Sequence, residues 1–251
     1  DDGTAYTVTD CLGSSAGALT IPSTHLDTTQ SPNTLPVTVI GDDAFASCFS
    51  LTSITLPNSV TTIKRGAFRS AIALISVNIP DGVTVIEQNA FNQCHSLTSI
   101  TIPDSVTELG TFTTQSGFIS RASCFNDCFS LASVTIGTGL TRIESSMFRN
   151  CRSLNNVTIP NNITHLGTSV FINCESLTSL VIPNSVTSSI SSIVAGCTNL
   201  TSITIGCGVT TVQVPFQDVP NLTTINFLPK SAPQLFTSAG LGTNIGTTCL
   251  L

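Results

Sequence analysis

A repeat of 23 residues constrains this chain more than any other feature of its sequence. The unit is marked by a leucine three residues after a small residue, and the marks fall at Leu51, Leu74, Leu97, Leu131, Leu154, Leu177, Leu200 and Leu222. The steps are 23 residues, apart from a last step of 22 and one of 34 that is a period plus an insertion of 11. A fixed period of this length is typical of a solenoid, in which each unit buries its apolar face against its neighbours.

The first half of each unit has the pattern of a short strand. In the unit from Cys48 to Ser70, Ile54 and Leu56 alternate with Ser53 and Thr55, which predicts one buried face and one exposed face. A proline follows in most units, and it ends the strand because it has no N–H and a fixed φ.

The second half returns the chain to the start of the next strand. Val60 and Ile63 are spaced to point inward, and a phenylalanine follows at Phe68 and at the equivalent position of most other units. Strands joined in this way are parallel, and their crossover is right-handed. We therefore predict a right-handed β/α superhelix of about nine 23-residue coils, with a parallel β-sheet on one face and short helical or 3₁₀ turns on the other.

Departures from the period divide the chain into three regions of one domain. Residues 1–34 are predicted to form an N-terminal cap and a first coil with an insertion, within which Ala5–Val8 could be a small edge strand. Residues 35–227 form the regular coils, with a loop inserted at 110–120, and residues 228–251 form a C-terminal cap. Caps are expected because a solenoid must cover its terminal apolar faces.

Six of the ten cysteines share one repeat position, where other units have alanine or valine: Cys48, Cys94, Cys128, Cys151, Cys174 and Cys197. A position that accepts these three residue types is small and buried, so we expect free thiols there. Neighbours in a parallel column point the same way, which is poor geometry for a disulfide or for tetrahedral zinc. The redox states of Cys11, Cys207 and Cys249 stay open.

Composition and motifs exclude several classes of function. Eight Lys plus Arg are scattered along a chain of net charge −6, which disfavours nucleic acid and anionic membrane as partners. No apolar run is long enough to cross a bilayer, so we expect no membrane insertion. No catalytic or metal-binding motif is present, and we expect neither an enzyme nor a cofactor.

The exposed strand face is the best candidate for a functional surface. Its residues are uncharged hydroxyls and amides, and the inserted loop adds two apolar rings that no column of the repeat accounts for. The candidate ligand-binding residues are Ser53, Thr55, Ser99, Thr101, Ser133, Thr135, Asn156, Thr158, Phe112 and Phe118. The alternative is that the polar rows only keep the sheet soluble and the loop only packs. Four N-x-[ST] sequons occur, at Asn156, Asn162, Asn199 and Asn221. If the host glycosylates them, a glycan on Asn156 would lie on the strand face and block it.

The unit closely resembles the BspA-like (Treponema pallidum type) leucine-rich repeat. The segment Leu97–Val106 reads L-T-S-I-T-I-P-D-S-V, and Ile86–Leu97 carries I-x-x-x-A-F-x-x-C-x-S-L. The resemblance covers about residues 35 to 227 and implies a leucine-rich-repeat solenoid on the cell surface or secreted. It also implies adhesion to extracellular-matrix or host cell-surface proteins, with no catalytic residues, and we expect a monomer. The alternatives are a structural or scaffolding array within a longer surface protein, or a carbohydrate-binding solenoid.

Overall fold

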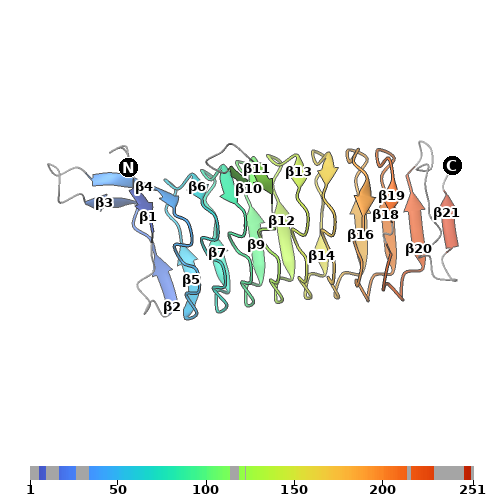
Figure 1. Ribbon diagram of the computed structural model, residues 1–251, viewed down its shortest axis with the longest axis horizontal. Helices are drawn as coiled ribbons and strands as arrows, with labels where there is room; N and C mark the ends of the chain where they lie inside the picture. Colours follow the sequence, from blue (N-terminus) through green and yellow to red (C-terminus); the bar gives the residue numbers. More distant parts are fainter. Residues whose placement is uncertain are drawn as a thin grey trace.

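The chain winds into an elongated solenoid of about eight turns, with β1 and β21 at opposite ends (Figure 1). The computed structural model describes residues 6–9, 17–26, 34–113, 119–121, 123–213, 216–228 and 246–249. The leucine-rich-repeat solenoid with parallel sheets is thereby confirmed. The count of nine coils and the hand of the crossover stay predictions.

One long side of the solenoid carries the strands of the repeat, together with one strand from each end of the chain. They are β2 (Gly17–Thr20), β5 (Leu51–Thr55), β7 (Ser76–Asn78), β9 (Ser99–Ile102), β12 (Ser133–Ile136), β14 (Asn156–Val157), β16 (Ser179–Ile182), β18 (Ser202–Ile205), β20 (Thr224–Phe227) and β21 (Gly246–Cys249). They pair in parallel as three sheets, β2-β5-β7, β9-β12-β14 and β16-β18-β20-β21. Equivalent residues of successive coils lie side by side, as with Ser179 and Ser202. We call the exposed residues of these strands the strand face.

The return side also carries parallel strands. They are β1 (Tyr6–Val8), β4 (Thr34–Ile40), β6 (Thr62–Ile63), β8 (Val85–Glu87), β10 (Glu108–Thr113), β13 (Arg142–Ile143), β15 (His165–Leu166), β17 (Ile190–Ser191) and β19 (Val212–Gln213). The predicted small edge strand is therefore present as β1, which pairs with β4.

The predicted helical or 3₁₀ turns are not observed, because the described residues contain no helix. The turns around the column phenylalanines contain residues with positive φ, such as Ser70 at 59° and Asn150 at 60°. A residue with left-handed backbone conformation every few positions prevents a right-handed helix from continuing. Several N–H groups bond to the next coil instead, as from Phe68 to the Ala90 carbonyl at 2.7 Å. The turns therefore form a ladder between coils.

Both insertions extend the return side as antiparallel hairpins. In the first, β3 (Thr24–Leu26) pairs with β4, and in the second, β11 (Ile119–Arg121) pairs with β10. Insertions into repeat proteins usually emerge from one face, and these two share one sheet.

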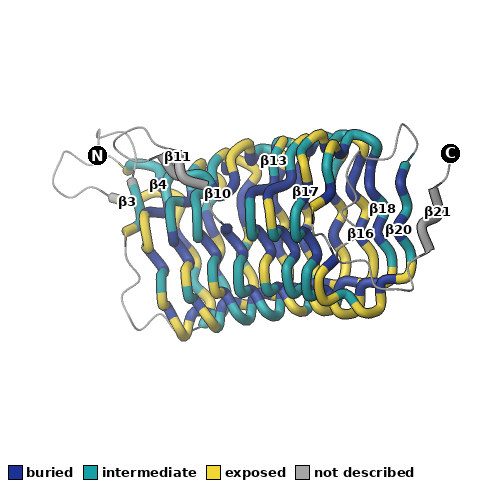
Figure 2. Tube along the Cα trace, turned by 45° about the vertical axis from the view of Figure 1, so that its right-hand side comes forward, coloured by how far each residue is buried: buried dark blue, intermediate teal, exposed yellow. Residues whose placement is uncertain are grey.

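A column of phenylalanine rings runs through the core between the two sides. The rings of Phe45, Phe68, Phe91, Phe125, Phe148 and Phe171 stack with centroids 5.1–5.7 Å apart and nearly parallel planes. All six are almost completely buried, and Figure 2 shows buried residues recurring in every coil. The phenylalanine position of the repeat therefore forms a continuous apolar column in the core.

The cysteine column lies beside this spine, and five of its thiols are free and buried as predicted. Each donates a hydrogen bond to the phenylalanine carbonyl of the preceding coil, for example Cys151 Sγ to Phe125 O at 3.2 Å. A weak donor is useful there because it satisfies a buried carbonyl in a small space.

The expectation of a free thiol at every cysteine of the column is wrong for Cys48, because Cys48 is disulfide-bonded. Its partner is not in the column, because the other five cysteines there are free. Neighbouring cysteines of the column point the same way, and this prevents a disulfide only between members of the column. Cys48 lies in the first regular coil, where its sulfur can bond to a cysteine outside the repeat.

Candidate functional site

The structure brings the predicted polar side chains together on the strand face. Ser53 is half-buried, and the other seven are exposed: Thr55, Ser99, Thr101, Ser133, Thr135, Asn156 and Thr158. They form rows because the strands pair without a shift in register, so that Ser133 lies beside Ser99 and Thr135 beside Thr101. Between them, Ile100 and Val134 point into the core. The rows offer hydrogen-bond donors and acceptors but no charge.

Of the two aromatic residues predicted with this face, Phe112 has its backbone in a different sheet. Phe112 lies in β10, whose hairpin with β11 belongs to the return-side sheet. The side chain of Phe112 and the whole of Phe118 lie outside the described residues. The predicted combination of strand face and inserted loop is therefore divided between two different sheets, because the insertion follows the turn and not the strand.

A ridge at the start of the strand face was missed by the sequence analysis. It consists of the residue after the small position of the repeat in five successive coils, together with one residue just before the second strand: Phe49, Ile72, Ile75, His95, Phe129 and Arg152. We call these six residues the edge ridge. Only four large hydrophobic residues are exposed in the described part of the chain, and three of them lie here, Phe49 at 59%, Ile72 at 38% and Ile75 at 47%.

Aromatic and charged groups continue the edge ridge toward the C-terminal coils. The rings of His95 and Phe129 stack with centroids 4.6 Å apart. The Arg152 guanidinium lies 5.1 Å from the centre of the Phe129 ring and forms an exposed ion pair with Glu175, with Nε to Oε1 at 3.4 Å. Exposed cation–π and ion pairs contribute at most about 1 kcal/mol each to stability. The ridge is thus poorly explained by folding alone.

The repeat itself contained a signal for this ridge. The exposed rows of the strands hold mostly Thr, Ser or Asn, whereas this column holds Phe, Ile, His, Phe and Arg in five successive coils, followed by Glu and Thr. Aromatic residues and Arg are enriched at protein interfaces, and exposed apolar patches mark interaction sites.

The buried thiols offer no nucleophile. Burial raises the pKa of three of them to about 12, namely Cys94, Cys124 and Cys197. Reactivity requires the thiolate, which is scarce at neutral pH when the pKa is this high. No group of three or more His, Cys, Asp or Glu side chains within the described ranges is placed to hold a metal ion.

A sequence-family comparison agrees with the repeat. The model described as the BspA type leucine rich repeat region matches in six copies over residues 23–117 and 119–238. No curated protein matches the chain.

Solved structures with the same architecture include the T. pallidum leucine-rich repeat protein TpLRR. It is 28% identical, with a TM-score of 0.52, over 70% of this chain and 84% of that one. A leucine-rich cell surface protein from Faecalibacterium prausnitzii is 24% identical, with a TM-score of 0.53, over 87% of this chain and 71% of that one. The second likeness supports the fold alone.

Across the described residues, no helix has the length and apolar character to cross a bilayer.

Proposed function

The chain belongs to the BspA-type leucine-rich repeat family, and from this membership we propose that it is a non-enzymatic adhesion module that binds an extracellular-matrix or host cell-surface protein. Leucine-rich repeats generally mediate protein–protein interactions, and proteins of this type are typically surface-exposed or secreted. The proposed binding surface is the edge ridge together with the polar rows of the strand face.

The observation that carries the proposal is the cluster of exposed apolar side chains on the edge ridge. Phe49, Ile72 and Ile75 lie in two successive coils of a surface otherwise rich in Ser and Thr. Leaving such side chains in water costs about 25 cal/mol for each Å² of apolar area. A partner that covers them recovers this free energy, while the neighbouring hydroxyls supply a polar rim.

The disulfide at Cys48 supports the proposed location. Disulfides persist in oxidising environments such as the cell surface and are rare in reducing compartments. The free cysteines of the column are compatible with such an environment because they are buried and each already donates to a carbonyl.

The test is saturable binding of the purified chain to immobilised fibronectin, fibrinogen and laminin and to host epithelial cells. The informative variant is the double substitution Phe49→Ser and Ile72→Ser, which should weaken binding at least 10-fold, since each hot-spot side chain contributes about 1–2 kcal/mol or more. Its matched control is Thr61→Ala with Thr84→Ala, two exposed positions of the return side, which should leave binding unchanged.

A second variant lacks residues 110–120 and tests whether the return-side hairpin takes part. Circular dichroism and thermal unfolding establish that every variant is folded. Absence of binding by the folded wild-type chain to all these targets would refute the adhesion proposal and favour a structural array.

A further inference from the structure

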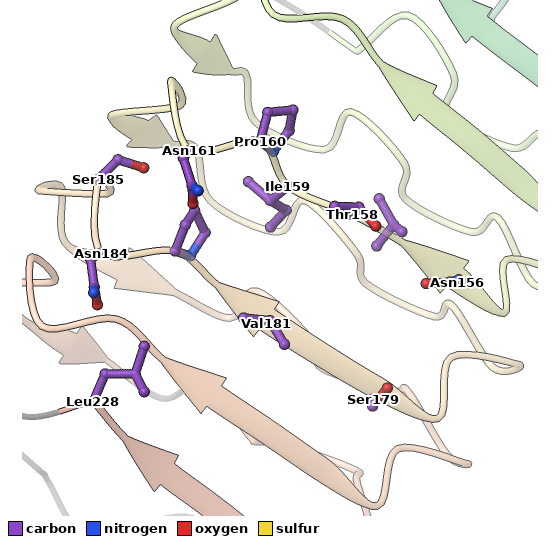
Figure 3. Close-up of a pocket in the computed structure, with 12 residues that line it drawn as sticks. Asn156, Thr158, Ile159, Pro160, Asn161, Ser179, Val181, Asn184, Ser185 and Leu228 are labelled. Atoms are coloured by element: carbon purple, nitrogen blue, oxygen red, sulfur yellow. The ribbon is translucent and has the colours of Figure 1, made fainter.

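The strand face is interrupted by a groove between β14 and β16. The groove has a volume of about 680 Å³ and is lined by Asn156, Val157, Thr158, Ile159, Pro160, Asn161, Ser179, Val181, Pro183, Asn184, Ser185 and Leu228. Figure 3 shows these side chains coming from two successive coils, with Leu228 at one end. A volume of this size is within the range of sites that bind small ligands or short peptide segments.

The groove exists because two adjacent coils do not pair along their strands. β14 pairs only with β12, and β16 pairs only with β18. In neighbouring coils, the N–H of Thr201 donates to Thr178 O at 2.9 Å, and that of Asn155 donates to Ala132 O at 3.3 Å. No described backbone hydrogen bond joins Thr178 to Asn155, which is the equivalent pair across the groove.

The same two coils remain joined on their return side. The N–H of Thr187 donates to Thr164 O at 3.0 Å. They are also joined just before the strands, where the N–H of Ser176 donates to Arg152 O at 2.9 Å. The two coils therefore separate only along β14 and β16 and the turns that follow these strands, where the groove lies.

The hydroxyl of Ser185 lacks a hydrogen bond where the two coils separate. In other coils, the side chain two residues after the strand-ending proline donates to the preceding coil, as Ser59 Oγ does to Val37 O at 2.7 Å and Ser105 Oγ to Val83 O at 2.6 Å. The equivalent Ser185 Oγ is buried and has no hydrogen-bond partner. A buried polar atom without a partner costs about 1–3 kcal/mol, so a ligand atom that bonds to it would be favoured.

The residues at the ends of the strands account for the position of the groove. Pro160 faces Pro183 across it, whereas Gly206 occupies the same position in the following coil and lets that coil approach Pro183 closely. Because Gly206 has no side chain, Leu228 from the next coil reaches the groove. Proline after proline is not sufficient by itself, since β5 and β7 pair although Pro57 and Pro80 follow them.

The lining defines the chemistry of an occupant. None of the twelve lining residues is charged. The amides of Asn156 and Asn161 and the hydroxyl of Ser179 can each donate and accept. Val181, exposed at 56%, and Leu228 provide aliphatic surface. Val181 stands where most other strands have Thr or Asn, so the row of polar residues is broken by an apolar contact at this one place.

We propose that this groove binds an extended, uncharged peptide segment of the partner protein, with a small aliphatic side chain placed against Val181 and Leu228. An extended peptide supplies both main-chain donors and acceptors, which match the amides, Ser185 Oγ and the strand edges that lack ladder partners. An uncharged lining disfavours charged segments because their desolvation would not be compensated. The aliphatic lining suits a peptide side chain better than a sugar ring, for which an aromatic platform is the usual partner. The inference rests on the proposed function and specifies the partner's chemistry.

The test begins with a displayed library of random seven-residue linear peptides selected against the full chain. Peptides that bind wild type are resynthesised and titrated by fluorescence polarisation against Val181→Arg and against the matched variant Thr84→Arg, which puts the same charge on an exposed position of the return side. Val181→Thr restores the residue of most coils and serves if the arginine variant does not fold. The peptides are also made with N-methyl groups on alternate peptide bonds.

We expect uncharged peptides with alternating aliphatic residues, whose affinity falls at least 10-fold with Val181→Arg and is unchanged with Thr84→Arg. N-methylation of one alternate set of peptide bonds should also weaken binding at least 10-fold. Selected peptides that bind both variants equally would overturn the proposal. So would hits on a glycan array that are lost with Val181→Arg, because the groove would then be a saccharide site.

Failure of the groove and failure of the adhesion proposal are distinguishable. If Val181→Arg binds the matrix proteins and cells as tightly as wild type does, the adhesion proposal stands and the groove is refuted. If wild type binds selected peptides in the groove but no matrix protein or cell, the groove stands and the adhesion proposal falls.

Discussion

Replacing Phe125 with leucine tests whether ring stacking along the core stabilises the solenoid. Phe125 is fully buried, and its ring stacks on Phe91 at 5.4 Å and on Phe148 at 5.7 Å between centroids. Phe171 is the matched position, because it is equally buried but stacks only on Phe148, at 5.7 Å, while the next coil has Val194. Both substitutions remove the same atoms, so their difference isolates one stacking contact.

The expected magnitudes follow from the number of stacked neighbours. Each aromatic pair contributes about 0.5–1.5 kcal/mol beyond the area it buries. A change of shape in the core adds about 1 kcal/mol in both variants. Phe125→Leu should therefore lower the free energy of unfolding by about 2–4 kcal/mol, and Phe171→Leu by about 1.5–2.5 kcal/mol.

Urea unfolding followed by far-UV circular dichroism measures this difference, because the chain has no Trp and only one Tyr as fluorescent reporters. With a denaturant slope of about 1–3 kcal/mol/M, a difference of 1 kcal/mol separates the two midpoints by about 0.3–1 M. Equal slopes are required, since a solenoid can lose cooperativity when a central coil is weakened. If Phe171→Leu costs as much as Phe125→Leu at equal slope, stacking is not the source of the stabilisation.

Three further predictions concern the thiols and a glycine. Burial raises the pKa to about 12 for Cys94, Cys124 and Cys197. Because their pKa is higher folded than unfolded, their contribution to stability is complete below about pH 8.5 and is lost as the pH rises toward about 12. The melting temperature should therefore fall steadily above about pH 9, and a flat profile would contradict the assigned burial. Of the seven described free cysteines, only Cys207 is partly exposed, so mass spectrometry after native alkylation should find it modified well before the other six. Gly206→Ala should destabilise the chain by about 1–3 kcal/mol, because its Cβ would lie 2.4 Å from the Pro183 carbonyl carbon. Gly82→Ala is the control, since its Cβ would lie 3.0 Å from the nearest atom, and equal melting temperatures for the two variants would show that the coils relax freely.

Much of the core could be predicted because the repeat aligns equivalent residues. The phenylalanine column and the small cysteine position were read from spacing alone, since residues 23 apart in sequence become neighbours in a stack. The buried and exposed positions of the strands followed from alternation, as in the rows containing Ser99 and Ser133.

The return side was predicted less well, because its conformation depends on φ values that composition does not fix. Ser70 and Asn150 both adopt the left-handed region, although serine is not a residue that signals it strongly. Their N–H groups bond to the following coil, and such bonds become available only once the coils are stacked. A helical turn was a reasonable expectation for one isolated unit, but not for a unit with neighbours.

Some features of this protein were determined by the sequence alone, whereas others, such as the edge ridge and the groove, were decided by the tertiary structure. The sequence by itself determined the period, the parallel stacking and which side chains enter the core, because these follow from the residue types within one unit. Only the tertiary structure decided that Phe49 and Ile72 lie exposed side by side, that the inserted hairpin belongs to the return side, and that β14 separates from β16. The distance between coils depends on pairs of residues from different units, such as Pro160 with Pro183 and Pro183 with Gly206. The repeat pattern specifies each unit on its own, whereas spacing is set by how closely two units can approach.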